Sequence, residues 1–191
     1  MSGPPPGPDA ERIVADTRRW LERAVIGLNL CPFARAPHAA GRIRWRVSAA
    51  RSPQALALDL RDELGHLQAA DPVRCETTLL IHPGVLDDFL DYNDFLDVAD
   101  RIVDELGLAG IIQVASFHPA YRFAGSPADD IGNHTNRSPY PMLHLLRESG
   151  VDRAVATMPD TGRIVERNIA TLRRLGPEGW RRLLAAPSDD D

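Results

Sequence analysis

The sequence predicts an α/β fold, in which a mostly parallel central sheet of about four strands is covered by helices. Continuous apolar runs at residues 77–81, 111–117 and 154–158 indicate strands that are buried on both faces, as in parallel sheets. Segments whose apolar residues recur at helical spacing separate these runs, and one amphipathic helix precedes them. The order of the strands stays open at this point.

The N-terminal helix is expected over residues 9–28, where Ile13, Trp20 and Leu28 share one apolar stripe. Residues 42–47 then alternate arginine with apolar side chains. This alternation indicates a strand at the edge of the sheet, with one face in solvent.

Apolar spacing predicts four further helices and a short final one, at residues 52–67, 87–106, 142–148, 161–175 and from Gly176 onward. The long stretch 119–138 has no regular period and is expected to be a functional loop. The helix at 142–148 is predicted because Pro139 and Pro141 suit the first turn of a helix.

The 191 residues favour one α/β domain at 9–186, between a disordered tail at 1–8 and an acidic tail at 187–191. The net charge of -5 argues against nucleic acid or membrane as a partner. With only two cysteines and no recognisable leader, a cytoplasmic protein is expected. The expected partner is a small-molecule substrate, and the oligomeric state stays open.

The chain contains no lysine, because all 22 of its Lys+Arg residues are arginine. A chain without lysine cannot form a lysine Schiff base, so pyridoxal-phosphate and class I aldolase chemistries are excluded. It also lacks the lysine of P-loop and protein-kinase sites.

Four histidines are candidate metal ligands: His82, His118, His134 and His144. The first two each precede a proline and follow an apolar strand, so parallel strands would bring them to one rim of the sheet. Imidazoles with a carboxylate form a plausible shell for an iron or zinc ion. The candidate carboxylates are Glu76, Asp129, Asp130 and Asp160. Equally open at this point are a haem with an axial histidine and histidines that only bond the backbone.

Further polar residues lie around the same predicted rim. The candidate catalytic residues are Cys31, Tyr121 and Tyr140. The candidate substrate-binding residues are Arg122, Asn136 and Arg137, which would hold a carboxylate or phosphate near the predicted helix start. Two other roles stay open for Cys31, which are a thiolate ligand of a metal and a small buried side chain.

Several segments resemble a bacterial family that is catalogued as a domain of unknown function. They read NLCPFA at 29–34, ETTLLIHP at 76–83, DYNDFL at 91–96, QVASFHPAYRFAG at 113–125 and TNRSPYPMLHLLRE at 135–148. The resemblance spans about residues 20–180. It implies that six residues within these segments form one set, namely Cys31, His82, His118, Asn136, Arg137 and His144. It implies no activity or cofactor.

The leading functional hypothesis is a metal-dependent enzyme that acts on a small polar or anionic molecule, with non-haem iron oxidation favoured over zinc hydrolysis. The alternatives are a haem-binding enzyme, a metal-free enzyme that depends on Cys31, and a non-catalytic anion-binding module. Each alternative uses the same group of residues in a different way.

Overall fold

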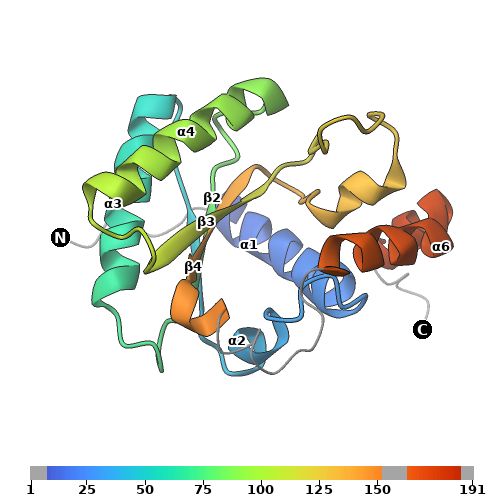
Figure 1. Ribbon diagram of the computed structural model, residues 1–191, viewed down its shortest axis with the longest axis horizontal. Coiled ribbons are helices and arrows are strands. Elements are labelled where there is room, and N and C mark those ends of the chain that lie inside the picture. Colours follow the sequence, from blue (N-terminus) through green and yellow to red (C-terminus); the bar gives the residue numbers. More distant parts are fainter. Residues whose placement is uncertain (1–7, 152–162, 186–191) are drawn as a thin grey trace.

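The computed structural model describes residues 8–151 and 163–185. The chain begins with α1 (Pro8–Trp20) and a π-helix, η1 (Leu21–Ile26), before α2 (Arg35–Ala39) and β1 (Ile43–Val47). It continues through α3 (Pro53–Ala69), β2 (Thr77–Ile81), α4 (Phe89–Glu105), β3 (Ile112–Phe117), η2 (Ile131–Thr135), β4 (Met142–Arg147) and α6 (Ile164–Leu184). The prediction of an α/β fold is confirmed (Figure 1).

The four strands form one sheet in the order β1-β2-β4-β3. β1 and β2 pair in parallel, whereas β4 runs antiparallel to both β2 and β3. The sheet is therefore mixed, and the prediction of a mostly parallel sheet needs this correction. β1 lies at an edge, as its alternating sequence predicts.

The strand β4 replaces the helix that was predicted at residues 142–148, and that prediction is wrong. Met142, Leu143 and Leu145 are all buried, which a strand in the middle of a sheet requires on both of its faces. A six-residue segment with four apolar residues fits a buried strand and a short helix equally well by spacing alone. The hydrogen bonds offered by β2 and β3 decide between them.

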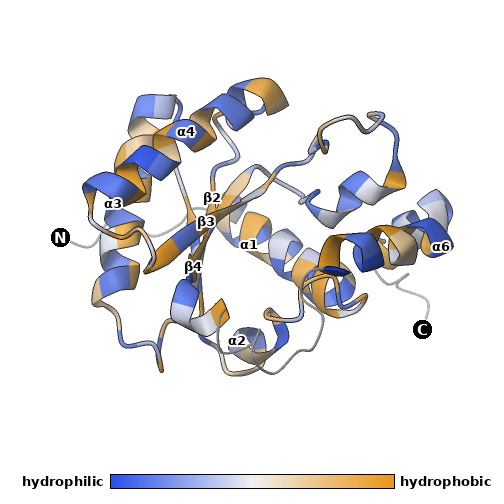
Figure 2. Cartoon of the chain, viewed as in Figure 1, coloured by the Kyte–Doolittle hydropathy of each residue, from blue (hydrophilic) through white to orange (hydrophobic). Residues whose placement is uncertain are grey.

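Two apolar layers cover the two faces of the sheet (Figures 1 and 2). On one face, Leu80, Leu143 and Leu145 pack with residues of α3 and α4. On the other face, Met142 and Leu79 pack with the aromatic residues and leucines of α1, η1 and α6. Because side chains alternate along a strand, two consecutive residues of one strand point into different layers.

The helices begin where capping residues stand. Ser52 accepts a hydrogen bond from the Ala55 N–H at the start of α3, and Asp88 accepts two at the start of α4. In α6, Gly176 has φ 69° and ψ 170°. The helix therefore kinks at this residue, where the sequence predicts a new helix.

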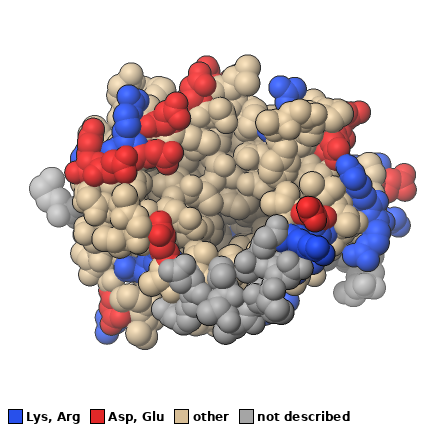
Figure 3. Space-filling view, viewed as in Figure 1, with Lys and Arg blue, Asp and Glu red and all other residues tan. Residues whose placement is uncertain are grey.

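The arginine face of β1 is less solvated than its alternation predicts. Glu63 of α3 is only 5% exposed, and its carboxylate lies 2.7 Å from Arg44 Nε and 3.5 Å from Arg46 Nε. A buried carboxylate requires such partners. Figure 3 shows other acidic side chains gathered on the outer surface around α4.

Several predictions fall wholly or partly outside the described residues, namely the tails at 1–8 and 187–191, the strand at 154–158 and the start of the helix at 161–175. Within 8–151 and 163–185, no helix combines the length and apolar character that a membrane span needs.

Tyr92→Phe tests how the end of the sheet is held. The Tyr92 hydroxyl donates to the Met142 carbonyl at 2.8 Å and accepts from the Phe117 N–H at 3.0 Å, so it joins β4 to β3. Removing it leaves both groups without this partner, and we expect a loss of about 1–3 kcal/mol of unfolding free energy in denaturant titrations. Tyr140→Phe is the matched control because its hydroxyl bonds only the partly exposed Asp16. Equal losses in the two variants would contradict this role.

Candidate functional site

His82 and His118 lie at the same end of the sheet, where β2 and β3 finish, as their positions after these two strands predict. β2 and β3 run in the same direction on either side of β4, so both histidines follow carboxyl ends at one edge. The ring centroids of His82 and His118 lie 5.8 Å and 5.0 Å from that of Tyr92, beneath α4.

Three of the four ring nitrogens of these two histidines bond to the backbone, and the buried Nε2 of His82 has no hydrogen-bond partner among the described residues. His82 Nδ1 donates to the Val85 carbonyl at 3.0 Å, and His118 Nε2 donates to the Leu86 carbonyl at 3.1 Å. His118 Nδ1 also accepts from the Ala120 N–H at 3.0 Å, which occupies both of its nitrogens. Leu86 has φ 59°, so the two rings hold a strained turn at the entry to α4. This geometry supports a structural role.

The other two predicted metal ligands lie elsewhere. His144 has the same parity on β4 as Met142 and therefore faces the α1 side of the sheet, opposite His82 and His118. His134 belongs to η2, and its ring packs 4.5 Å from that of Trp180. Within the described residues, no three His, Cys, Asp or Glu side chains gather into a group that could hold a metal ion.

The predicted substrate-binding residues mostly hold their own loop together. Arg137 donates to the carbonyls of Tyr121 and Ala128, and Asn136 donates to the Ser116 carbonyl. Since β4 replaces the expected helix, the N-terminus that would attract an anion is absent here.

The remaining predicted residues also lie in different places. Arg122 lines a shallow depression beside α4. The Tyr121 ring packs between Phe89 and Phe123. Tyr140 donates to Asp16 at a separate depression, which His134 and Arg137 also line.

The candidate carboxylates also divide among different places. Asp130 Oδ1 accepts from the Gly132 N–H at 2.7 Å and so caps η2. Asp129 is exposed, and Asp160 lies outside the described residues. Glu76 alone borders a cavity, which is described next.

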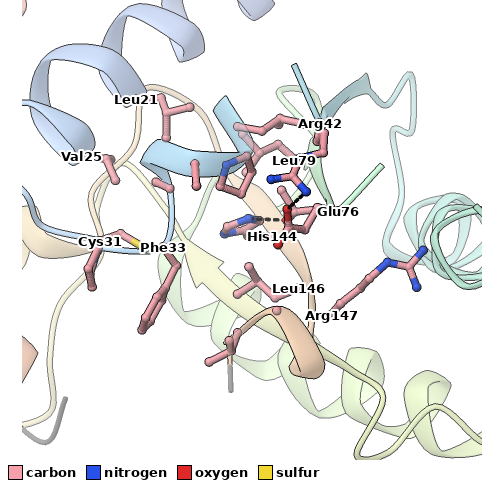
Figure 4. A pocket seen from close by; sticks show the side chains of 18 of the residues that line it. Leu21, Val25, Cys31, Phe33, Arg42, Glu76, Leu79, His144, Leu146 and Arg147 are labelled. Carbon is pink, nitrogen blue, oxygen red and sulfur yellow. Dashed lines mark hydrogen bonds and ion pairs between the residues drawn. The ribbon is translucent and has the colours of Figure 1, made fainter. Parts of the chain in front are cut away.

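A cavity of about 360 Å³ lies on the α1 side of the sheet and reaches the edge where β1 and β2 begin. Its lining combines η1, the segment 31–37, and residues of all four strands. Cys31 and Phe33 stand on one side, whereas Arg42, Glu76 and His144 stand opposite them (Figure 4). In Figure 3 the middle of the molecule is hollowed and formed mainly by uncharged residues. The sequence predicts the ligand site at the other edge, beyond the strand ends.

His144 is the polar centre of this cavity. Its Nε2 lies 2.7 Å from Thr77 Oγ1, which in turn donates to the Leu145 carbonyl at 2.6 Å. Since a carbonyl only accepts, the Thr77 proton points to Leu145, and His144 Nε2 must carry the proton between the two side chains. Nδ1 then keeps its lone pair and has no hydrogen-bond partner among the described residues. Burial lowers the pKa of His144 to about 4, so the ring is neutral at pH 7.

Cys31 lies across the cavity from His144 (Figure 4). Burial raises the pKa of its thiol, and the backbone N–H groups of Phe33 and Ala34 act in the opposite direction more weakly. The side chain is therefore a thiol at neutral pH, and it is one of two free cysteines. The other, Cys75, is buried and donates to the Thr77 carbonyl.

Two arginines border the same cavity in different ways. Arg42 Nη1 lies 3.0 Å from Glu76 Oε2, and both side chains are mostly buried. Arg147 contributes its aliphatic stem, because its guanidinium turns away to the carbonyls of Leu67, Ala70 and Cys75 (Figure 4).

Sequence reasoning missed Arg42 and Thr77 as site residues. The available signal was a charged or hydroxyl residue at the beginning of a strand.

Three histidines with lowered pKa values predict a pH-dependent stability. Burial lowers the pKa of His82, His134 and His144 to about 4, whereas an unfolded histidine has a pKa near 6.5. The unfolded chain therefore binds more protons between these values, and the unfolding free energy falls as the pH drops from about 6.5 to 4. For the fully buried His82 alone, the loss is on the order of 3 kcal/mol.

Denaturant titrations at pH 7, 6 and 5 measure this loss. His82→Asn should flatten the pH profile, whereas His66→Gln, at an exposed position of α3, should keep it. A wild-type unfolding free energy that stays constant from pH 7 to 5 would refute the assignment of neutral buried rings.

The whole cavity lies within the part of the chain that a known family covers. The family model described as "Protein of unknown function (DUF1415)" matches residues 12–182. No curated protein and no solved structure matches the chain. The match includes every residue that lines the cavity, together with both edges of the sheet. The chain thus belongs to the DUF1415 family.

Proposed function

We propose that the protein is an enzyme that acts on a small molecule in the cavity between the sheet and η1, with His144 as its general base. The observation that carries this proposal is an oriented neutral imidazole whose Nδ1 lone pair has no partner among the described residues of the cavity. Functional sites commonly combine an apolar pocket with a few polar groups and a perturbed pKa.

In this proposal, each residue around His144 has a part in the reaction. Thr77 fixes the tautomer and the ring orientation of His144, so that Nδ1 is the atom that takes a proton from the substrate or from water. Burial disfavours the imidazolium, which makes proton uptake by His144 less favourable and the return of the proton to a leaving group more favourable. The apolar residues around the ring separate this exchange from bulk water.

Iron, zinc or haem chemistry draws little support from the positions of the histidines. His118 uses both ring nitrogens on backbone groups, and His144 faces the opposite side of the sheet. A metal-dependent reaction at the cavity would need donors besides the four histidines that the sequence singles out. The metal-free alternative agrees better with the groups that line the cavity.

A second candidate is covalent catalysis by Cys31 in the same cavity. The specific observation is that Cys31 lines the wall opposite His144, where the N–H groups of Phe33 and Ala34 lower the pKa of the thiol against the larger effect of burial. A thiolate formed during the reaction would gain from these two donors. The two candidates share one pocket and differ in whether a covalent intermediate forms.

His144→Gln is the central test of the proposal. The purified protein is incubated with a bacterial metabolite extract, and compounds consumed or formed are followed by mass spectrometry. We expect a conversion by the wild type that falls at least 100-fold in His144→Gln, because glutamine cannot accept the proton. His134→Gln is the matched control, since His134 has an equally low pKa but lies outside the cavity.

Equal conversion by wild type and His144→Gln would refute the assignment of the base. Loss of conversion in both His144→Gln and His134→Gln would indicate damage to the fold instead of the reaction. Addition of a metal chelator should leave the wild-type conversion unchanged. Complete loss of conversion on addition of the chelator would instead support a metal-dependent reaction.

Cys31→Ser separates the two candidates. If His144 acts alone, the serine variant keeps the conversion within a few-fold, because serine preserves the shape of the wall. If Cys31 is the nucleophile, conversion falls by several orders of magnitude and the wild type accumulates a mass adduct on the peptide that contains residue 31. Cys75→Ser is the control, because Cys75 is buried outside the cavity lining.

A further inference from the structure

We propose that the cavity selects an uncharged, planar ligand with an N–H or O–H donor at its polar end, and that it discriminates against carboxylates and ammonium ions of the same shape. This inference rests on the proposed function, because it names the substrate class of the same site. It departs from the anionic substrate that Arg122 and Arg137 suggest in the sequence.

The charges around the cavity are compensated or directed elsewhere. Five ionisable side chains line it among the described residues: Cys31, Arg42, Glu76, His144 and Arg147. Arg42 and Glu76 neutralise each other at 3.0 Å. The guanidinium of Arg147 lies on backbone carbonyls at the C-terminal end of α3. Cys31 and His144 are neutral, so no described residue of the lining offers an uncompensated charge to an ion that loses its hydration in the cavity.

The polar end offers an acceptor to the ligand. His144 Nδ1 presents a lone pair, which repels a carboxylate oxygen and accepts from an N–H or O–H group. A ligand donor such as an amide, an indole or a phenol would satisfy this atom. A carboxylate has no proton to donate at neutral pH.

The walls beside His144 favour a flat ligand. The Phe117 ring centroid lies 6.1 Å from the His144 ring and 5.5 Å from the Trp20 ring, and Phe33 stands on the opposite side. Aromatic walls bury planar ligands well through edge and face contacts. The volume of about 360 Å³ is at the compact end for small-molecule pockets.

Three probes of one shape test the inference: 2-naphthamide, 2-naphthoate and 2-naphthylmethylammonium. Their dissociation constants are measured with the full chain at pH 7.5, by fluorescence titration. We expect 2-naphthamide to bind at least tenfold more tightly than either ion, and to slow the alkylation of Cys31 by iodoacetamide. Equal or tighter binding of an ion, no saturable binding of the amide, or no protection of Cys31 would overturn the inference.

Glu76→Gln tests the cause of the selectivity. This change leaves the charge of Arg42 uncompensated at the cavity, so 2-naphthoate should gain at least tenfold in affinity while 2-naphthamide changes little. Glu63→Gln is the matched control, since it breaks a buried ion pair with Arg44 away from the cavity lining. An identical shift in both variants, or none in Glu76→Gln, would contradict the inference.

The two proposals fail in different ways. If the ions bind best while His144→Gln still abolishes conversion, only the substrate class is wrong. If the amide binds selectively while His144→Gln converts as the wild type does, the cavity is a binding site and the base is misassigned. The wild-type probe series decides the selectivity even if Glu76→Gln does not fold.

Discussion

The arrangement of this protein depends on the insertion of β4 between β2 and β3. This strand fills the gap between two strands that run the same way, and its hydrogen bonds close the middle of the sheet. Because side chains alternate, the same strand supplies Leu143 and Leu145 to the layer under α3 and α4, and His144 to the opposite layer. One strand thus builds one core and carries the central polar group of the cavity on the other face. The polar groups of the protein are consequently sorted by face, and this sorting decides which of them can act together.

Much of the fold could be predicted because its elements carry strong local signals. The leucines of α3, the capping residues Ser52 and Asp88, and the apolar run of β2 all agree with their environment. The prediction that 111–117 is buried on both faces is wrong, because β3 lies at an edge of the sheet and only Ile112 in it is buried. The signal failed at β4, where six residues after two prolines fit two structures equally well. Local spacing contains no information about the partners that a segment will find, and only pairing with β2 and β3 makes 142–147 a strand.

The candidate site was less predictable for the same reason. The positions of His82 and His118 after their strands correctly placed both rings at one end of the sheet, but the face that His144 uses follows from strand register. Histidine as a residue type suggests a metal ligand. In the structure these two rings instead donate to the backbone carbonyls of Val85 and Leu86 and so hold a strained turn. Thr77 shows the opposite case, because an ordinary strand residue becomes important only once His144 lies across from it.

Arg147 helps to fix the register of β4. Its guanidinium reaches across the edge of the sheet to the carbonyls of Leu67 and Ala70, so the last residue of the strand is anchored to the far end of a helix on the opposite layer. A shift of β4 by a single residue would exchange its two faces, sending the imidazole into the leucine core and Leu143 or Leu145 into the cavity. Such a slipped chain would keep its helices and its sheet, and yet it would have no polar centre. The polar lining of the cavity therefore depends on the alignment of the strand as much as on the identity of the residues on it.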